Sequence, residues 1–398
     1  MQFPARFADL PEYAFPRLRT LLAGVAPGGP ELAMTIGEPR QPLPPRVAEL
    51  VGRHVAEFGR YPPNDGTPEL LEAIAGWLAR RHGVAIDPGT RILALNGTRE
   101  GLFSASLALS PEEKRGARPV VLVPNPFYQA YGAGALAAGA DLVPVPATAE
   151  TGFLPDYAGL PPALLDRVTL AFICSPANPQ GAVAGEAWIA GLLGLAERHD
   201  FRLLCDECYS EIYLDVPPPG ALAAAAAAGA DPERVLVFNS LSKRSSVPGL
   251  RSGFAAGGPQ TIAAMKRLRA YGGAPLPLPL QRAAAALWGD EGHVALARAS
   301  YAARFAVADA VLAGFPGYAR PAGGFFLWLR VGDGEAAALR LWRETGVQVL
   351  PGAYLGRATA EAPNPGDGYV RVALVADTAS VERGLVAIRD TLSHERVR

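Results

Sequence analysis

The feature that most constrains the fold is the alternation of helical patterns with short apolar runs along the first two thirds of the chain. Residues 67–82 open on Thr67, a good helix N-cap, and continue with apolar residues at helical spacing. Further helices are predicted over 97–109 and 127–139, and strands over 91–95, 119–124, 141–145, 168–174, 202–205 and 234–238. Strands that alternate with helices form a mostly parallel sheet covered by helices on both faces, so we predict an α/β fold.

The pattern changes after residue 285. The elements predicted there are helices over 291–313, 335–345 and 377–393 and strands over 325–331 and 369–375. The first 45 residues are rich in Pro and Gly and read as an irregular arm, and the alanine-rich stretch 221–231 reads as a surface helix or loop. We predict an N-terminal arm that is also part of a small domain, a large domain and a smaller α+β C-terminal domain, over residues 1–45, 46–285 and 286–398.

Charge and composition argue against several classes of partner. The chain carries 37 basic and 38 acidic side chains, a net charge of −1, whereas nucleic-acid-binding proteins usually carry a basic surface. No window is long and apolar enough for a membrane helix, and the first residues lack the apolar core of a secretory signal. Cys174, Cys205 and Cys208 suit a reducing compartment better than a disulfide framework. We expect a cytoplasmic protein with no nucleic-acid or membrane partner.

The spacing Cys205-x-x-Cys208 raises the alternative of a zinc or redox site. A structural zinc site needs four convergent ligands. The sequence offers no second cysteine pair and no paired-histidine motif. We therefore predict no metal.

The segment SLSKRSSVPGLR, residues 240–251, carries the strongest chemical signal. Lys243 follows an apolar strand and is flanked by Ser240 and Ser242, and Arg251 lies eight residues further on. A lysine amine can bond covalently to an aldehyde cofactor, while the hydroxyls and the guanidinium hold a phosphate on that cofactor. Burial would lower the pKa of the amine and suit it to nucleophilic attack and proton transfer. The alternatives are a surface lysine and the Ser-x-x-Lys motif of serine hydrolases.

Polar residues also follow other predicted strands, at the ends where the chemistry of such sheets gathers. Asp206 can form a salt bridge to a protonated ring nitrogen, and Tyr209 and Asn178 can donate hydrogen bonds to a ring oxygen. The alternatives are a helix-capping aspartate, a packed tyrosine and an ordinary Asn-Pro turn.

Three further positions fit the same kind of site. Thr98 and Arg99 open a helix after Gly97, and the backbone N–H groups of a helix start bind phosphate readily. Tyr128 can stack on a cofactor ring, although an ordinary packed aromatic residue is the simpler reading. Arg371 is a positive charge inside an apolar strand and needs an anionic partner, either a substrate carboxylate or a structural salt bridge.

Together these segments resemble the fold type I pyridoxal phosphate-dependent aminotransferases of classes I and II, along nearly the whole chain. The motifs that carry the resemblance are GEPRQPLP, RYPPNDGTPELLEAI, NGTRE, NPFYQAY, SPANPQG, DECY, SLSKRSSVPGLR and YVRVAL. The resemblance implies a large domain with a mostly parallel sheet, a smaller α+β domain, pyridoxal 5′-phosphate as cofactor and a homodimer with shared active sites.

The resemblance also implies a role for each site residue. Lys243 would be the catalytic residue that binds the cofactor, Asp206 would bind its nitrogen, and Tyr128 would stack on its ring. Asn178 and Tyr209 would contact its 3′-oxygen. The residues expected around the phosphate are Thr98, Arg99, Ser240, Ser242 and Arg251, with Tyr61 from the neighbouring subunit. The substrate α-carboxylate would be bound by Gly37, Asn178 and Arg371.

A finer resemblance is to the N-succinyldiaminopimelate aminotransferases of bacterial lysine biosynthesis. It implies amine exchange between N-succinyl-L,L-diaminopimelate and 2-oxoglutarate. Because both substrates are acidic at their far end, we expect a cation in the distal pocket; the candidates are Arg19, Arg99, Arg244 and Arg269. The sequence departs from the usual family pattern at Gln180, at Asn96 to Arg99 and at Gly272-Gly273.

Other functions of the same scaffold stay open. One is transamination of another amino acid, such as aspartate, an aromatic residue, acetylornithine or acetyldiaminopimelate. Others are a pyridoxal phosphate-dependent lyase or cyclopropane-forming synthase, and a non-catalytic ligand sensor. A panel of amino acids and the identity of the released product would separate them.

Overall fold

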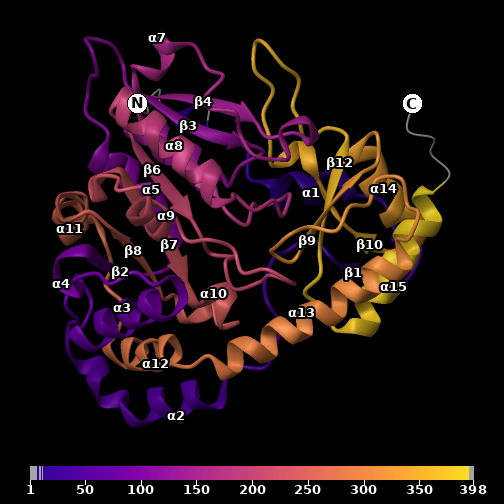
Figure 1. Cartoon of the computed structure of the whole chain (residues 1–398). Coiled ribbons are helices and arrows are strands. Elements are labelled where there is room, and N and C mark those ends of the chain that lie inside the picture. The colour runs from indigo at the N-terminus through magenta and orange to yellow at the C-terminus, as the bar shows by residue number, and fades with distance from the viewer. Residues whose placement is uncertain (1–6, 9, 11, 394–398) are drawn as a thin grey trace, which may run out of the picture.

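The computed structural model describes residues 7, 8, 10 and 12–393, and its larger lobe is built on a seven-stranded sheet (Figure 1). The order across the sheet is β2-β8-β7-β6-β5-β3-β4. The strands are β2 (Ile92–Leu95), β3 (Val120–Asn125), β4 (Asp141–Pro146), β5 (Val168–Cys174), β6 (Arg202–Asp206), β7 (Val235–Ser240) and β8 (Gly253–Gly257). The pairs from β7 across to β4 are parallel, which confirms the predicted α/β fold. Only β8 runs antiparallel to its two neighbours, and the sequence did not reveal it.

Helices cover both faces of this sheet. They are α2 (Pro45–Arg53), α3 (Pro68–His82), α4 (Pro88–Arg91), α5 (Thr98–Leu109), α6 (Gln129–Ala137), α7 (Pro162–Leu165), α8 (Glu186–His199), α9 (Ala221–Ala227), α10 (Leu241–Arg244), α11 (Pro259–Gly272) and α12 (Leu278–Trp288). Short 3₁₀ turns lie at η2 (Val55–Gly59), η3 (Ala149–Thr151), η4 (Pro232–Arg234) and η5 (Pro248–Leu250).

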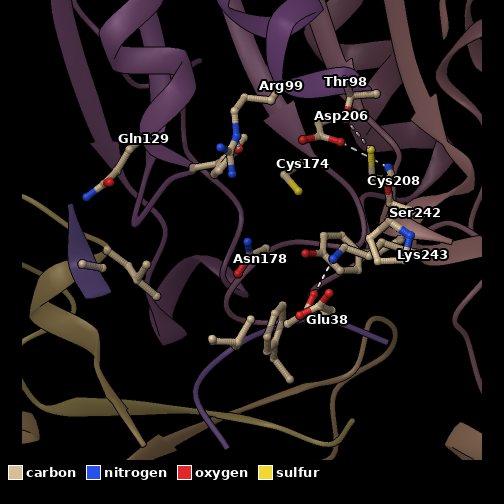
Figure 2. A pocket seen from close by; sticks show the side chains of 18 of the residues that line it. Glu38, Thr98, Arg99, Gln129, Cys174, Asn178, Asp206, Cys208, Ser242 and Lys243 are labelled. Carbon is tan, nitrogen blue, oxygen red and sulfur yellow. Dashed lines mark hydrogen bonds between the residues drawn. The ribbon is translucent and has the colours of Figure 1, made fainter. Parts of the chain in front are cut away.

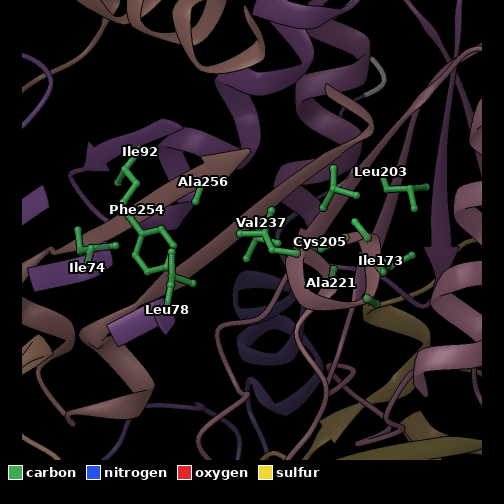
Figure 3. Packing of buried hydrophobic residues seen from close by; sticks show 14 of the residues in the cluster. Ile74, Leu78, Ile92, Ile173, Leu203, Cys205, Ala221, Val237, Phe254 and Ala256 are labelled. Atoms are coloured by element: carbon green, nitrogen blue, oxygen red, sulfur yellow. The ribbon is translucent and has the colours of Figure 1, made fainter. Parts of the chain in front are cut away.

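Alternate residues of each strand enter two separate apolar layers. Val120 belongs to the layer that includes α3, α8, α9 and α12, whereas Val121 belongs to the layer that includes α5, α6 and α11. Figure 3 shows part of the first layer, with Phe254 of β8 and Ile74 of α3. Because both faces are covered, a ligand site has room only at an edge of the sheet.

The second lobe combines residues from both ends of the chain. Its antiparallel sheet has the order β11-β12-β9, and a parallel pair joins β1 to β10. Its elements are α1 (Ala14–Leu22), β1 (Leu32–Ala33), α13 (Gly292–Val311), β9 (Phe326–Arg330), α14 (Gly334–Thr345), β10 (Val347–Gln348), β11 (Leu350–Pro351), η6 (Gly352–Tyr354), β12 (Tyr369–Ala373) and α15 (Thr378–Leu392). In Figure 1 the long helix α13 runs from the larger lobe into this one. The domain boundaries at residues 45 and 285 stay a prediction.

Two readings of the sequence were wrong in detail. The first 45 residues are not simply irregular, because they contain α1 and β1, and Leu32 and Met34 are buried in the apolar core of the second lobe. The alanine-rich stretch forms α9, yet Leu222 and Ala225 are buried in the layer beneath the sheet. A stretch composed mostly of alanine gives no clear apolar pattern, so its burial could not be predicted from composition. Among the described residues, no helix is long and apolar enough to cross a membrane.

Candidate active site

A pocket of about 330 Å³ lies at the carboxyl ends of the parallel strands, facing the second lobe (Figure 2). Strand register explains its place. Cys174 of β5 pairs with Asp206 of β6, which pairs with Phe238 of β7, so the loops after these strands start at one level. The predicted site residues that line the pocket are Gly37, Thr98, Arg99, Tyr128, Asn178, Asp206, Tyr209, Ser240, Ser242, Lys243, Arg251 and Arg371. Tyr61 does not line it and is fully exposed.

Lys243 lies in the short helix α10, directly after β7. Ser240 caps this helix, because its hydroxyl accepts a hydrogen bond from the backbone N–H of Ser242 at 3.3 Å. The amine of Lys243 donates to the carbonyl oxygen of Gly37, from the N-terminal part of the chain. Burial, together with a smaller effect of nearby Arg371, lowers the pKa of Lys243 to about 8. The lysine is therefore a buried amine held close to its reactive form, which rules out the surface alternative.

Asp206 lies at the end of β6 and is fully buried beneath the pocket. Its Oδ2 accepts a hydrogen bond from the hydroxyl of Tyr131 at 2.7 Å, and its Oδ1 accepts one from the backbone N–H of Cys208 at 3.2 Å. Burial raises the pKa of Asp206, while the bonds from Tyr131 and Cys208 oppose that rise. A buried carboxylate is costly unless it is paired with a positive charge, and a cationic ring nitrogen placed here would supply that charge.

Tyr131 is the site residue that sequence reasoning missed. Its ring is buried and stacks on Phe172 at a centroid distance of 4.6 Å, which directs its hydroxyl toward Asp206. Tyr131 follows Tyr128 by three residues at the start of α6, and that helical spacing was the available signal.

The turn that begins α5 forms a cradle for an anion. Gly97 adopts a φ of +80°, and a Cβ there would lie 2.0 Å from Nη2 of Arg251, so only glycine allows the guanidinium to pack over this turn. The hydroxyl of Thr98 lies 3.2 Å from the sulfur of Cys208, which lies 3.8 Å from the hydroxyl of Ser240. Backbone N–H groups, two hydroxyls and a guanidinium thus meet at one point, as a phosphate requires.

Arg371 is buried in β12 and lacks an anionic partner among the described residues. One guanidinium nitrogen donates to Oδ1 of Asn178 at 3.0 Å and another to the carbonyl oxygen of Thr35 at 2.8 Å, while Nε has no partner. Burial lowers the pKa of Arg371 to about 10. The structural salt bridge is therefore excluded for the described residues, and a ligand carboxylate would supply the missing charge.

Tyr128 and Arg99 form one wall of the pocket. Nε of Arg99 donates to the hydroxyl of Tyr128 at 2.6 Å, and the Tyr128 ring packs edge-on against Tyr131. The Arg99 side chain is thus directed at Tyr128, away from the Gly97 turn, and of the four arginines suggested for the distal pocket it alone lines the cavity.

The other three candidates for the distal pocket were wrong. Arg244 is buried against Trp77 and Trp288, where its guanidinium pairs with Glu291. Arg269 is buried in a pairing with Glu100, and Arg19 lies in α1 outside the cavity lining. Among the described residues, no group of three or more His, Cys, Asp or Glu side chains is arranged to hold a metal ion.

The cofactor expected from the motifs fits these residues. The site offers a buried amine for an aldehyde, a buried carboxylate for a ring nitrogen, and the Gly97 cradle for a phosphate. The unpartnered Nε of Arg371 remains for a carboxylate outside the cofactor. The donor set therefore matches both pyridoxal phosphate and an amino-acid substrate.

Comparisons with known proteins agree with this site. Residues 30–388 match the family model described as aminotransferase class I and II. An LL-diaminopimelate aminotransferase of Desulforudis audaxviator is 32% identical to the chain, over 97% of each protein. The solved structure of an aminotransferase from Neisseria meningitidis has a TM-score of 0.93 at 37% identity and covers 98% of this chain and 100% of its own. Aminotransferase AspB from Helicobacter pylori has a TM-score of 0.89 at 34% identity, with 99% and 100% covered. These matches confirm the resemblance to aminotransferases.

Proposed function

Because the chain belongs to the class I and II aminotransferases, which depend on pyridoxal phosphate, we propose that it transaminates N-succinyl-L,L-diaminopimelate with 2-oxoglutarate. The products are N-succinyl-2-amino-6-oxopimelate and glutamate, and the reaction belongs to bacterial lysine biosynthesis. The observation that supports the choice of substrate is the lining of the pocket, which includes Tyr13, Phe15 and Ile36 together with Arg99, the one lining arginine not assigned to the phosphate or the α-carboxylate through its side chain.

Each site residue has a task in holding the cofactor. Lys243 would hold the aldehyde carbon, Asp206 the ring nitrogen, and Asn178 and Tyr209 the 3′-oxygen. Tyr128 would pack against the ring. The phosphate would be held by Thr98, Ser240, Ser242, Arg251 and the backbone of Arg99. When bound, the cofactor supplies a ring that accepts the electron pair left on the substrate α-carbon when its proton is removed.

Lys243 also moves the proton. Its lowered pKa, about 8, lets the amine exist in its neutral form near physiological pH and accept the α-proton of the substrate. The carbonyl oxygen of Gly37 accepts a hydrogen bond from that amine and so fixes its direction. The same amine would then deliver the proton to the C4′ carbon of the cofactor, and water would release the oxo acid while the amino group stays on the cofactor.

Arg371 binds the α-carboxylate and so orients the α-carbon. Its guanidinium offers a planar fork of donors, and Asn178 and Thr35 hold the fork in place. With the carboxylate fixed, the α-carbon would be held in the pocket that Lys243 also lines.

Arg99 and its apolar neighbours select the far end of the substrate. The apolar residues at the rim include Tyr13, Phe15 and Ile36, of which Tyr13 and Ile36 are 44% and 48% exposed. A succinyl group converts the distal ammonium of diaminopimelate into a neutral amide that carries a terminal carboxylate. An apolar rim with one arginine suits that acyl group better than it suits a free ammonium.

Free LL-diaminopimelate is the second candidate substrate, because relatives at 32% identity carry that name. The test mixes cofactor-loaded protein with N-succinyl-L,L-diaminopimelate, LL-diaminopimelate, glutamate, aspartate and aromatic amino acids, and follows the cofactor absorbance. Conversion by the succinylated compound and by glutamate supports the proposal. Conversion by the free compound in place of the succinylated one favours the second candidate, and no conversion by any amino acid rejects transamination.

A variant tests the role of Arg99. Arg99→Gln should raise KM for both succinylated substrate and 2-oxoglutarate by about tenfold or more, the value of one charge-assisted hydrogen bond. Arg118→Gln is the matched control, because Arg118 is exposed and pairs with Asp141 away from the pocket. Equal KM values in the two variants would remove Arg99 from the distal site.

We also propose a homodimer in which Tyr61 completes the partner's phosphate site. Tyr61 is fully exposed, and Tyr271 is 93% exposed. Val55 and Phe58, close to Tyr61 in sequence, are also more than half exposed, and exposed apolar residues that gather on one surface are typical of sites that bind another protein. Sedimentation at several concentrations would show whether the chain associates.

A further inference from the structure

One buried arginine, Arg269, links the loop that carries Tyr61 to the loop that follows α11. Tyr271 lies in the last turn of α11, and Tyr61 and Tyr271 are the two most exposed aromatic side chains among the described residues. Arg269, near the end of α11, donates one guanidinium nitrogen to the carbonyl oxygen of Asn64 and another to that of Ala274 at 3.1 Å. Its side chain is 3% exposed. The two loops are therefore held at a fixed spacing from inside the protein.

The residue at position 273 leaves room for the side chain of Arg269. A Cβ at Gly273 would lie 2.2 Å from Cγ of Arg269, so a glycine is needed for the loop to close over the side chain. This packing gives a physical reason for Gly273 but not for Gly272, where a Cβ would meet nothing within 4 Å.

The same arginine connects to the anion cradle at the start of α5. Its Nη2 lies 2.8 Å from Oε1 of Glu100, and that oxygen also accepts the backbone N–H of Asn96 at 2.7 Å. The carbonyl oxygen of Asn96 accepts a hydrogen bond from Arg251 at 3.4 Å. A continuous set of contacts thus runs from the exposed loops through Arg269 and Glu100 to the turn at Gly97.

The charge on Glu100 explains how these contacts would act on phosphate binding. Glu100 lies in the first turn of α5, one turn from the N–H groups that would face a phosphate. An unpaired carboxylate there would repel the phosphate, and the guanidinium of Arg269 neutralises it. A shift of the loops that moved Arg269 would therefore weaken anion binding in the cradle.

A second buried side chain, Gln281, links the same two loops but does not contact the cradle at Gly97. The side chain of Gln281, 1% exposed, accepts the backbone N–H of Thr67 and donates to the carbonyl oxygen of Leu276, both at 2.7 Å. Gln281 has no hydrogen bond to the α5 turn. It offers a control in which the loops are loosened but the charge on Glu100 stays paired.

We propose that the Arg269–Glu100 pair couples the docking of a second copy of this chain to the binding of the cofactor phosphate. The pair acts as a positioning element and touches neither ligand. The inference rests on the proposed homodimer and on the phosphate site at Gly97. By linkage, phosphate binding tightens self-association by the same factor by which self-association tightens phosphate binding.

The experiment measures the self-association constant of full-length apoenzyme by sedimentation, without and with saturating pyridoxal phosphate. In the wild type we expect the cofactor to tighten association about tenfold, within the usual range of couplings. In Arg269→Gln and in Glu100→Gln this factor should fall to the part that the proposed Tyr61 contact alone supplies, which Tyr61→Phe measures separately. In Gln281→Met association should weaken while the factor persists. A circular dichroism spectrum shows that each variant is folded.

A second measurement separates coupling from simple loss of structure. Direct titration of apoenzyme with pyridoxal phosphate should show a larger loss of affinity in Arg269→Gln than in Glu100→Gln, because only the first leaves an unpaired carboxylate near the phosphate. The double variant should recover part of that loss. Inorganic phosphate as a competing probe should follow the same order.

The outcomes are distinguishable. A wild type that stays monomeric under all conditions overturns both the homodimer and this inference, while transamination can still be assayed. A wild-type dimer that the cofactor tightens, with the same factor in Arg269→Gln and Glu100→Gln, overturns the coupling alone. An equal loss of the factor in Gln281→Met also overturns it, because loosened loops would then be sufficient.

Discussion

The hydroxyl of Tyr131 should set the strength with which the protein holds its cofactor. Replacing Tyr131 by Phe removes one oxygen and leaves the ring stacked on Phe172. Asp206 then keeps only the bond from the backbone of Cys208. Because burial already raises the pKa of Asp206, loss of the Tyr131 donor raises that pKa further. A protonated Asp206 cannot pair with a protonated ring nitrogen.

The size of the effect follows from the contact that is lost. A hydrogen bond to a charged group is worth about 1.5–3 kcal/mol. The 2.7 Å bond is fully buried, so water does not replace it at no cost. We expect the affinity of the apoenzyme for pyridoxal phosphate to fall by roughly 10- to 100-fold. The loss should grow as the pH falls, because Asp206 of the variant takes up its proton at a higher pH than in the wild type.

The assay is a spectrophotometric titration of apoenzyme with pyridoxal phosphate between pH 6 and pH 9. Tyr157→Phe is a matched control, because Tyr157 is equally buried and its hydroxyl donates to the carbonyl oxygen of Phe172 at 2.7 Å, outside the pocket. That control should lose about 1 kcal/mol of stability and no cofactor affinity. Equal affinities in Tyr131→Phe and wild type at every pH would refute the argument.

Three further predictions concern separate parts of the site. Covalent attachment of pyridoxal phosphate to Lys243 should speed up about tenfold per pH unit below pH 8 and level off above it in stopped-flow absorbance, because only the neutral amine attacks. Arg371→Lys should raise KM for every amino-acid substrate by roughly 10- to 100-fold in steady-state assays while cofactor affinity is unchanged, since lysine lacks the fork geometry. Gly97→Ala should displace Arg251 and lower cofactor affinity at least about tenfold by titration, whereas Gly83→Ala, at a φ of +68° with open space around it, should cost only about 1 kcal/mol of stability.

The positions of the candidate site residues could be predicted because they follow from topology. A parallel sheet brings the carboxyl ends of its strands to one edge, so the residues after β5, β6 and β7 had to meet there. Lys243, Asp206 and Asn178 illustrate this, since each follows an apolar run that was visible in the sequence. Strand β8, with the sequence GFAAG, escaped detection because glycine and alanine have weak strand preference.

The partners of charged side chains could not be predicted in the same way. Arg244 and Arg269 stood in suitable segments for a substrate site, yet both are buried arginines that form ion pairs with the partly exposed Glu291 and Glu100. Those carboxylates lie 47 and 169 residues away in sequence, and a pairing over such separations is a property of the packed chain. The role of Tyr131 depends in the same way on Phe172, which fixes its ring from another strand.

The site stores unfavourable interactions that its ligands relieve. Lys243 has a lowered pKa and Asp206 a raised one, which means that burying each charged group costs folding free energy. Arg371 adds a third cost, because its Nε has no hydrogen-bond partner among the described residues. The cost at Lys243 is fully present below pH 8 and fades as the pH rises toward the ordinary lysine value, because the unfolded chain then also loses the proton. The cost at Asp206 changes with pH in the opposite way. It grows as the pH rises from the ordinary aspartate pKa to the raised pKa of the folded protein, because the carboxylate then has to be buried in its charged form. Pyridoxal phosphate would relieve the first two costs, because its aldehyde can bond to Lys243 and its cationic ring nitrogen can pair with Asp206. A substrate carboxylate would relieve the third by pairing with Arg371. Binding energy that would otherwise only hold the ligands would thereby act on the three residues that we propose for the transfer, Lys243, Asp206 and Arg371.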